Sequence, residues 1–216
     1  MSAPKLVIFD CDGVLVDSET ITNVLLRDDL AGRGLNLSLT EIMAIFVGGT
    51  MSGVAKKAAE MGADIPGDWV DGFYKKMHEG LARGTPLIDG VEAVIDRLDA
   101  VGIPYCVGSN GSLEKMGITL GQHPRVQARL AGKLYSAHAL GTAKPDPDMF
   151  LIAAREFGVA PGDCAVIDDS PTGCIAARRA GMQGFGFAEH DDGARLAAEG
   201  AIVFHRMADL PALLKV

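Results

Sequence analysis

The chain has 216 residues, of which 48% are hydrophobic, 22% charged and 6% aromatic. This composition is typical of one large globular domain, or of a domain that carries a smaller insert, and it excludes disordered and fibrous proteins. A formal net charge of -8, with Lys and Arg residues scattered along the chain, argues against nucleic acid as a partner. An anionic ligand would have to be attracted locally, by a metal ion or by backbone N–H groups.

The first apolar run and the cysteines bear on the compartment. The run Lys5 to Phe9 is too short for the hydrophobic region of a signal peptide, and no stretch approaches the ~18 apolar residues of a membrane span. The four cysteines show no CxxC pairing and no His at zinc-ligand spacing, which favours reduced thiols that act as small hydrophobic side chains. We therefore expect a cytoplasmic protein with no membrane partner. Nothing in the pattern demands more than a monomer.

Hydrophobic periodicity predicts a first strand, a helical segment, and then alternating strands and helices. The first strand is 5–9. Residues 17–84 carry helical patterns with no convincing strand, at 18–30, 40–45, 51–61 and 68–81. The later predicted strands are 104–108, 134–137, 164–167, 184–187 and 201–204. The predicted helices between and after them are 90–100, 112–120, 147–157, 172–180, 192–199 and 207–214.

This order of elements indicates an α/β fold. Strands that alternate with amphipathic helices are typical of a parallel sheet with helices on both faces. We predict a doubly wound, Rossmann-like parallel sheet formed by residues 1–16 and 85–216, with an inserted helical cap domain at residues 17–84. The insert leaves the sheet domain just after its first strand, and we expect it to act as a lid.

Two acidic segments follow predicted strands. Asp10-Cys11-Asp12-Gly13 comes after the first strand, and Asp168-Asp169 comes after the strand at 164–167. The first segment alone reads equally well as an acidic turn, because Asp and Gly are common turn residues. In a doubly wound sheet, however, both segments lie at the carboxyl edge, where ligands bind. Like charges held close together repel unless a cation sits among them, and carboxylate oxygens suit Mg²⁺. The sequence therefore predicts a magnesium site.

Two further segments supply groups that bind an anion. Ser109 and Asn110, within Gly108-Ser109-Asn110-Gly111, end another predicted strand with a hydroxyl, a side-chain amide and glycine-flanked N–H groups. Lys144 lies on a proline-bounded loop ahead of a helix, which restricts the reach of its ammonium group. Alone, the first segment is an ordinary turn and the second a solvated charge. Beside two acidic pairs they indicate a phosphate site.

Taken in order, these segments resemble the four sequence motifs of the haloacid dehalogenase (HAD) superfamily: Asp10 with Asp12, then Ser109, Lys144 and the Asp168–Asp169 pair. The resemblance covers the whole chain, and four ordered motifs are far more specific than one. The helical insert resembles the cap of the subgroup that contains beta-phosphoglucomutase and phosphoglycolate-type phosphatases. Val16-Asp17-Ser18-Glu19 matches that subgroup's usual continuation of the first motif.

The resemblance implies roles for the acidic residues. Asp10 would attack phosphorus in line and form an aspartyl-phosphate, and Asp12 would protonate the leaving oxygen and later take a proton from water. Mg²⁺ would be held by the side chain of Asp10, the main-chain carbonyl of Asp12, and Asp169 with help from Asp168. The expected activity is that of a phosphoric monoester hydrolase.

The resemblance also implies a substrate class. Ser109, Asn110 and Lys144 would bind the oxygens of the transferring phosphoryl group, where stabilisation of charge supplies most of the rate. The partner would be a small phosphorylated metabolite, either a sugar phosphate or a phosphoglycolate-like acid. Specificity is expected on the insert, with these candidates: Glu19, Phe46, Gly49, Thr50 and Met51.

Two other functions remain open at this point. Sugar phosphomutases of the subgroup usually carry a cap His near the position of Thr22 and a cap Arg shortly after a Lys-Gly pair. The loop from Phe46 to Met51 offers neither that Lys nor that Arg, so hydrolysis is favoured, although four lysines of the insert keep the mutase alternative alive. A phosphate-accepting signalling module is disfavoured, because in receivers the adjacent acidic pair comes first and a roughly 70-residue insert has no place.

Overall fold

The computed structural model describes residues 3–46 and 50–216, and the chain forms two compact units. One unit consists of Met1–Asp17 and Pro86–Val216, and the other of Ser18–Thr85. Within the described ranges, none of the helices combines the length and the apolar character that crossing a bilayer requires. All four cysteines are free and buried, as expected of small hydrophobic side chains.

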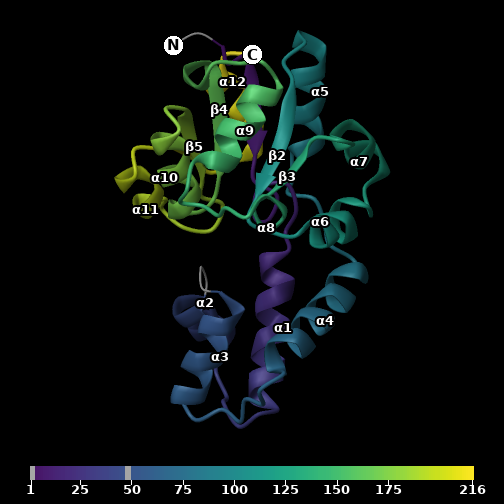
Figure 1. The fold of residues 1–216 in the computed structure, drawn as a ribbon, viewed down its shortest axis with the longest axis vertical. Helices are drawn as coiled ribbons and strands as arrows, with labels where there is room; N and C mark the ends of the chain where they lie inside the picture. Colours follow the sequence, from purple (N-terminus) through teal and green to yellow (C-terminus); the bar gives the residue numbers. More distant parts are fainter. Residues whose placement is uncertain (1–2, 47–49) are drawn as a thin grey trace. The chain divides into compact units, whose positions relative to one another are not determined.

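The first unit is built on a six-stranded parallel sheet with the order β3-β2-β1-β4-β5-β6 (Figure 1). Its strands are β1 (Leu6–Phe9), β2 (Tyr105–Ser109), β3 (Leu134–Ser136), β4 (Cys164–Asp168), β5 (Gln183–Phe187) and β6 (Ile202–Phe204). Its helices are α5 (Val91–Val101), α6 (Leu113–Leu120), α7 (Pro124–Leu130), α8 (Ala137–Leu140), α9 (Asp148–Glu156), α10 (Pro171–Arg179), α11 (Ala194–Ala198) and α12 (Leu210–Leu214). Short 3₁₀ turns occupy Pro161–Asp163 and Met207–Asp209. The predicted doubly wound α/β class is confirmed.

Alternating side chains of each strand build two hydrophobic cores, one on each face of the sheet. Val7 and Phe9 of β1 belong to a core that contains buried residues of α5, α6, α7 and α12. Leu6 and Ile8 of the same strand belong to a core that contains buried residues of α8, α9 and α10. Because both faces are covered, the strands read as continuous apolar runs, which is why the sequence located them.

The second unit is helical, with α1 (Glu19–Ala31), α2 (Leu39–Phe46), α3 (Met51–Glu60) and α4 (Trp69–Ala82). Its helices bury an apolar stripe each, as shown by Leu26 and Leu30 of α1 and by Phe73 and Met77 of α4. The stacked rings of Trp69 and Phe73, with centroids 5.1 Å apart, add to this core. The sequence predicted helices without strands for this segment, and the residues that the structure describes there form helices and no strand.

Candidate active site

The carboxyl ends of β1, β2 and β4 meet at one edge of the sheet, and each delivers polar residues there. Asp10 follows β1 directly, and its N–H donates to the carbonyl of Ile167 at 2.8 Å, which extends the pairing between β1 and β4. Ser109 ends β2 and Asp168 ends β4. Parallel neighbours end at the same edge, so residues far apart in the chain come together here.

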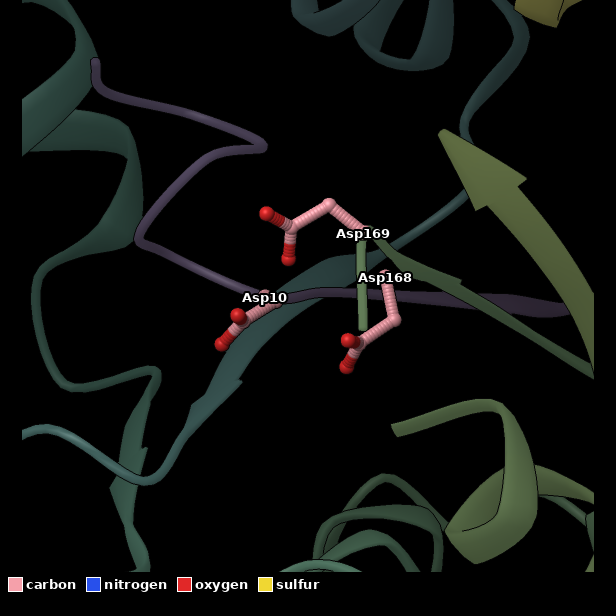
Figure 2. Close-up of side chains that lie close together, drawn as sticks. All are labelled: Asp10, Asp168 and Asp169. Carbon is pink, nitrogen blue, oxygen red and sulfur yellow. The ribbon is translucent and has the colours of Figure 1, made fainter. Parts of the chain in front are cut away.

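Three carboxylates cluster at this edge (Figure 2). Asp10, Asp168 and Asp169 each offer an oxygen, and these oxygens lie within 4.8 Å of one another. Asp10 and Asp168 are buried, with 8% and 1% of their surface exposed. Sequence analysis predicted that the two acidic segments converge, and the structure brings them together.

Two glycines make room for this cluster. A Cβ atom at Gly13 would lie 2.0 Å from Oδ2 of Asp169, and the backbone there has a φ of +71°. A Cβ atom at Gly173 would lie 1.9 Å from the carboxyl carbon of Asp168. Real Cβ atoms do not approach other atoms so closely, so only glycine fits at either position while the carboxylates keep their places.

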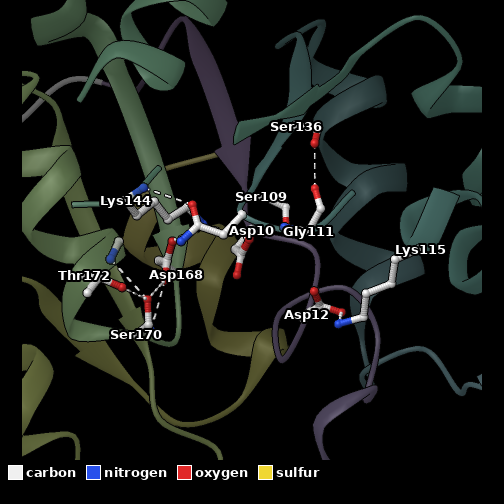
Figure 3. A network of polar contacts seen from close by, with 12 residues as sticks. Asp10, Asp12, Ser109, Gly111, Lys115, Ser136, Lys144, Asp168, Ser170 and Thr172 are labelled. Carbon is white, nitrogen blue, oxygen red and sulfur yellow. Dashed lines mark hydrogen bonds and ion pairs between the residues drawn. The ribbon is translucent and has the colours of Figure 1, made fainter. Parts of the chain in front are cut away.

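Lys144 is the buried cation of the site, with 7% of its surface exposed. Its Nζ lies 2.8 Å from Oδ1 of Asp10 and 2.7 Å from Oδ2 of Asp168 (Figure 3). Burial alone would lower the pKa of Lys144, but the two carboxylates outweigh it and raise the pKa above its ordinary value. Lys144 is therefore charged at neutral pH.

The environment of Asp10 disfavours its charged form, and the positive charge of Lys144 offsets this effect only in part. Burial raises the pKa of Asp10 most, Lys144 lowers it, and Asp168 and Asp12 raise it, so that the net effect takes the pKa from the ordinary value of 3.8 to about 7. Within the described part of the chain, Oδ1 of Asp10 is buried without a hydrogen bond, although Lys144 Nζ is 2.8 Å away. A carboxylate in this position is stabilised by an additional cation.

The donor set fits a hard divalent cation. Three carboxylates and one ammonium group leave an excess of two negative charges when all are ionised. Oxygen ligands are those that Mg²⁺ prefers. Asp168 is held on both oxygens: Oδ2 by Lys144, and Oδ1 by the N–H and hydroxyl of Ser170 at 3.0 and 2.6 Å. Both oxygens of Asp168 are therefore engaged by protein groups.

The predicted phosphate-binding residues lie at the same edge. Ser109 is buried, with 1% exposed, and its Oγ accepts a hydrogen bond from the N–H of Gly111 at 3.0 Å. Asn110 makes a contact that the sequence did not indicate: its Oδ1 accepts from the N–H of Lys144 at 2.9 Å. Asn110 therefore connects β2 to the loop that carries Lys144, whereas its action as a donor to phosphate stays a prediction.

Asp12 lies beside the cluster, and Lys115 of α6 pairs with it at 2.9 Å between Nζ and Oδ1. Sequence analysis named neither Lys115 nor Ser170. Ser170 had a local signal, since it precedes Pro171 and caps α10 by accepting from the N–H of Gly173. Lys115 lies three residues after the cap Ser112 of α6, a spacing that places it in the first turn without indicating its partner.

The specificity candidates lie in the helical unit and are described only within it. Glu19 and Thr50 are exposed, Met51 is partly exposed and Phe46 is buried. The hydroxyl of Thr50 accepts from the N–H of Gly53, so this residue caps α3. Gly49 lies outside the described residues. A substrate-binding role for these residues stays a prediction.

Comparison with known proteins gives consistent matches. A family model described as a haloacid dehalogenase-like hydrolase matches residues 4–181. A probable pseudouridine-5'-phosphatase of Drosophila melanogaster is 31% identical over 184 residues, which cover 82% of this chain and 78% of that protein. The 6-phosphogluconate phosphatase of Escherichia coli is 28% identical over 216 residues, covering 100% and 96%. A HAD family hydrolase from Deinococcus radiodurans, solved with bound phosphate and sodium, is 32% identical with a TM-score of 0.86, covering 100% and 97%.

Proposed function

Because this chain belongs to the haloacid dehalogenase-like hydrolases, as its four motifs predicted, we propose that it is a Mg²⁺-dependent phosphatase of a small phosphorylated metabolite. It is a phosphoric monoester hydrolase, in line with the phosphatases among its relatives. The observation that carries the mechanistic proposal is the convergence of Asp10, Asp168 and Asp169, with buried Lys144 in contact with the first two.

The metal would be held by the side chains of Asp10 and Asp169 and by the main-chain carbonyl of Asp12. Asp168 would support it indirectly by orienting Lys144, since both Asp168 oxygens are engaged by protein groups. When bound, Mg²⁺ supplies two positive charges that stabilise ionised carboxylates and phosphoryl oxygens. The excess of two negative charges at this edge supports that assignment.

The chemistry proceeds in two steps. An Oδ atom of Asp10 attacks phosphorus, the bond between phosphorus and the ester oxygen breaks, and Asp12 gives its proton to that leaving oxygen. Asp12, now a carboxylate, takes a proton from the water that attacks the aspartyl-phosphate, which returns Asp10 and releases phosphate. The Asp10 side chain is buried, and a nucleophile shielded from bulk water is less solvated and more reactive.

Phosphoryl oxygens would be bound by the groups that end β2 and by Lys144. The hydroxyl of Ser109, the N–H groups next to it and the ammonium of Lys144 are all donors. Asn110 fixes the backbone of Lys144 through its amide oxygen, which supports a cation held at a defined place. These groups stabilise the charge that spreads over the transferring group.

Hydrolysis is favoured over phosphate migration by an observation in the helical unit. A mutase has to hold a second phosphate, which calls for cationic or donor side chains on the insert. Thr22 stands near the position of the mutase His, and its hydroxyl donates to the carbonyl of Ser18 at 2.8 Å within its own helix. We propose that the insert Ser18–Thr85 acts as the cap domain, and that Glu19, Phe46, Gly49, Thr50 and Met51 include its specificity residues. A monomer in the cytoplasm also stays a prediction.

The test is release of phosphate by the purified protein from sugar phosphates, 6-phosphogluconate and phosphoglycolate, with Mg²⁺ and with EDTA. We expect turnover of at least one of these esters with Mg²⁺ only. Asp10→Asn should abolish it, by at least about 10⁴-fold, because the attacking oxygen is removed. Asp163→Asn, at a surface carboxylate paired with Lys5, is the matched control and should keep full activity. Retained turnover in Asp10→Asn would refute the nucleophile assignment.

A further inference from the structure

The ion pair between Lys115 and Asp12 is a charged contact at this edge that the proposed function does not use. Nζ of Lys115 lies 2.9 Å from Oδ1 of Asp12, and the two side chains are only 17% and 19% exposed (Figure 3). Exposed ion pairs contribute little and hold no fixed geometry, whereas a partly buried pair restrains both side chains. Lys115 therefore restrains the position of the Asp12 carboxyl group.

The local structure fixes Lys115 in turn. Ser112 caps α6, and its Oγ accepts from the N–H of Lys115 at 3.1 Å, which places Lys115 in the first helical turn. Gly111 provides the space: a Cβ atom there would lie 3.3 Å from Oδ2 of Asp12 and 3.8 Å from Cδ of Lys115. The helix start and the side-chain-free backbone of Gly111 together hold the pair between β1 and α6.

The charge of Lys115 is maintained despite its burial. Burial alone would lower its pKa, but the neighbouring carboxylate of Asp12, followed by Cys11 and Asp10, raises it above the ordinary value. The ammonium group is thus a permanent donor. An ammonium can donate to a carboxylate oxygen and, more weakly, to the carbonyl oxygen of a carboxylic acid, so Oδ1 can accept from Lys115 before and after proton transfer.

We propose that Lys115 is a positioning residue for the general acid: it anchors Oδ1 of Asp12, so that Oδ2 is the oxygen that exchanges the proton with the leaving group. This inference rests on the proposed function, in which Asp12 is that acid. As the bond between phosphorus and the ester oxygen breaks, its electron pair stays on the ester oxygen, and the proton moves from Oδ2 to that oxygen. Lys115 takes part in phosphoryl transfer to Asp10 only through Asp12, by positioning the group that protonates the leaving oxygen.

The inference predicts that Lys115 matters in proportion to how much the leaving group needs a proton. Phenyl phosphate and 4-nitrophenyl phosphate have nearly the same shape, but nitrophenolate is a stable anion that departs without protonation. General acid catalysis should therefore contribute strongly to the first ester and weakly to the second. Because kcat/KM reports steps up to loss of the leaving group, it isolates this difference from hydrolysis of the intermediate.

The experiment measures kcat/KM for both esters with Mg²⁺ in wild type, Lys115→Met and Asp12→Asn. We expect Lys115→Met to lose at least about 10-fold on phenyl phosphate and less than about 3-fold on 4-nitrophenyl phosphate, since a positioned acid is worth about 10²–10⁴-fold. Lys133→Met, which removes a cation that lies 4.9 Å from the Tyr105 ring centre, is the matched control and should leave both values unchanged. If Lys115→Met is unfolded at the assay temperature, Lys115→Gln is compared with wild type on the same two esters.

The outcomes separate the two ideas. Selective loss in both Asp12→Asn and Lys115→Met supports the inference. Selective loss in Asp12→Asn with equal loss, or none, in Lys115→Met overturns the role of Lys115 and leaves the proposed function standing. Equal loss on both esters in Asp12→Asn refutes Asp12 as the acid, and the inference falls with it.

Discussion

Each unit of this protein contains a carboxylate with charged neighbours, and these neighbours shift the pKa values of the two carboxylates in opposite directions. Asp29 of α1 accepts from Trp69 Nε1 at 2.7 Å, Arg33 Nε at 2.8 Å and Lys76 Nζ at 3.1 Å. Burial would raise the pKa of Asp29, but these donors, Trp69 first, outweigh it and lower the pKa. Asp10, by contrast, has one cation and several acidic neighbours, and its pKa is raised to about 7.

The difference shows what distinguishes a structural carboxylate from a reactive one. Asp29 is surrounded by donors, so folding stabilises its charge and the residue joins α1 to α4. Around Asp10 the fold leaves negative charge uncompensated, which destabilises the folded protein and is compatible with the proposed cation site. The next three predictions test this contrast, beginning with the largest expected effect.

Removal of the buried cation should be the most damaging change. Lys144→Met leaves Asp10 and Asp168 buried without their shared partner, so we expect a loss of about 3–5 kcal/mol in the free energy of unfolding. Phosphatase activity should fall by about 10²–10³-fold as well, because a donor to the transferring group is lost. Denaturant unfolding and steady-state kinetics measure the two effects. Lys5→Met, at an exposed pair with Asp163, is the control and should change stability by less than about 1 kcal/mol.

Because the pKa of Asp10 is raised, the free energy of unfolding in EDTA should decrease as pH rises. Unfolded Asp10 ionises near pH 3.8 and folded Asp10 near pH 7, so the folded state binds more protons between these values. Stability contributed by this group is present at low pH and is lost as pH rises from about 4 to about 7, by a few kcal/mol, since one pKa unit is worth about 1.4 kcal/mol. Asp10→Asn should lack this decline, and Mg²⁺ should flatten it in the wild type.

Melting curves at several pH values, for both proteins and with and without Mg²⁺, provide the measurement. Parallel curves for wild type and Asp10→Asn in EDTA would contradict the assigned burial effect. A decline of the same steepness in saturating Mg²⁺ would argue against Asp10 as a ligand.

The smallest effect is expected in the helical unit. Asp29→Ala leaves the indole N–H of Trp69 without its acceptor, at a cost of about 1–3 kcal/mol, while phosphate release at saturating Mg²⁺ from a folded sample should be retained. Trp69 is the single tryptophan of the chain, so its fluorescence follows unfolding of this unit. Asp28→Ala, next to it and paired with Arg27 at the surface, should have little effect. Equal melting of the two variants would mean that Asp29 does not join the helices.

The strands and the acidic cluster could be predicted from sequence because their signals are local. Each apolar run marked a buried strand, and the boundaries agree to within one residue, as for 5–9 against Leu6–Phe9. The polar residues that follow β1, β2 and β4 then had to meet at one edge, given a parallel sheet.

The elements and contacts that sequence reasoning missed have physical reasons. α7 (Pro124–Leu130) has seven residues that alternate between polar and apolar, a pattern that is not typical of a helix. α8 (Ala137–Leu140) has four residues, too few for a helical period to be recognised. The pairings of Lys115 with Asp12 and of Asn110 with Lys144 depend on how separate loops pack. Residue spacing does not contain that information.

The neighbour relation of β1 and β4 has a consequence for synthesis on the ribosome. β1 is translated before the other strands of its sheet, but one of its two edges stays without a partner until β4 has been translated. Loop closure over so many residues is slow, and the exposed strand edge would be open to wrong pairing meanwhile. Asp10 is therefore translated early, whereas the carboxylate cluster that it forms with Asp168 and Asp169 can be complete only after β4 has been translated.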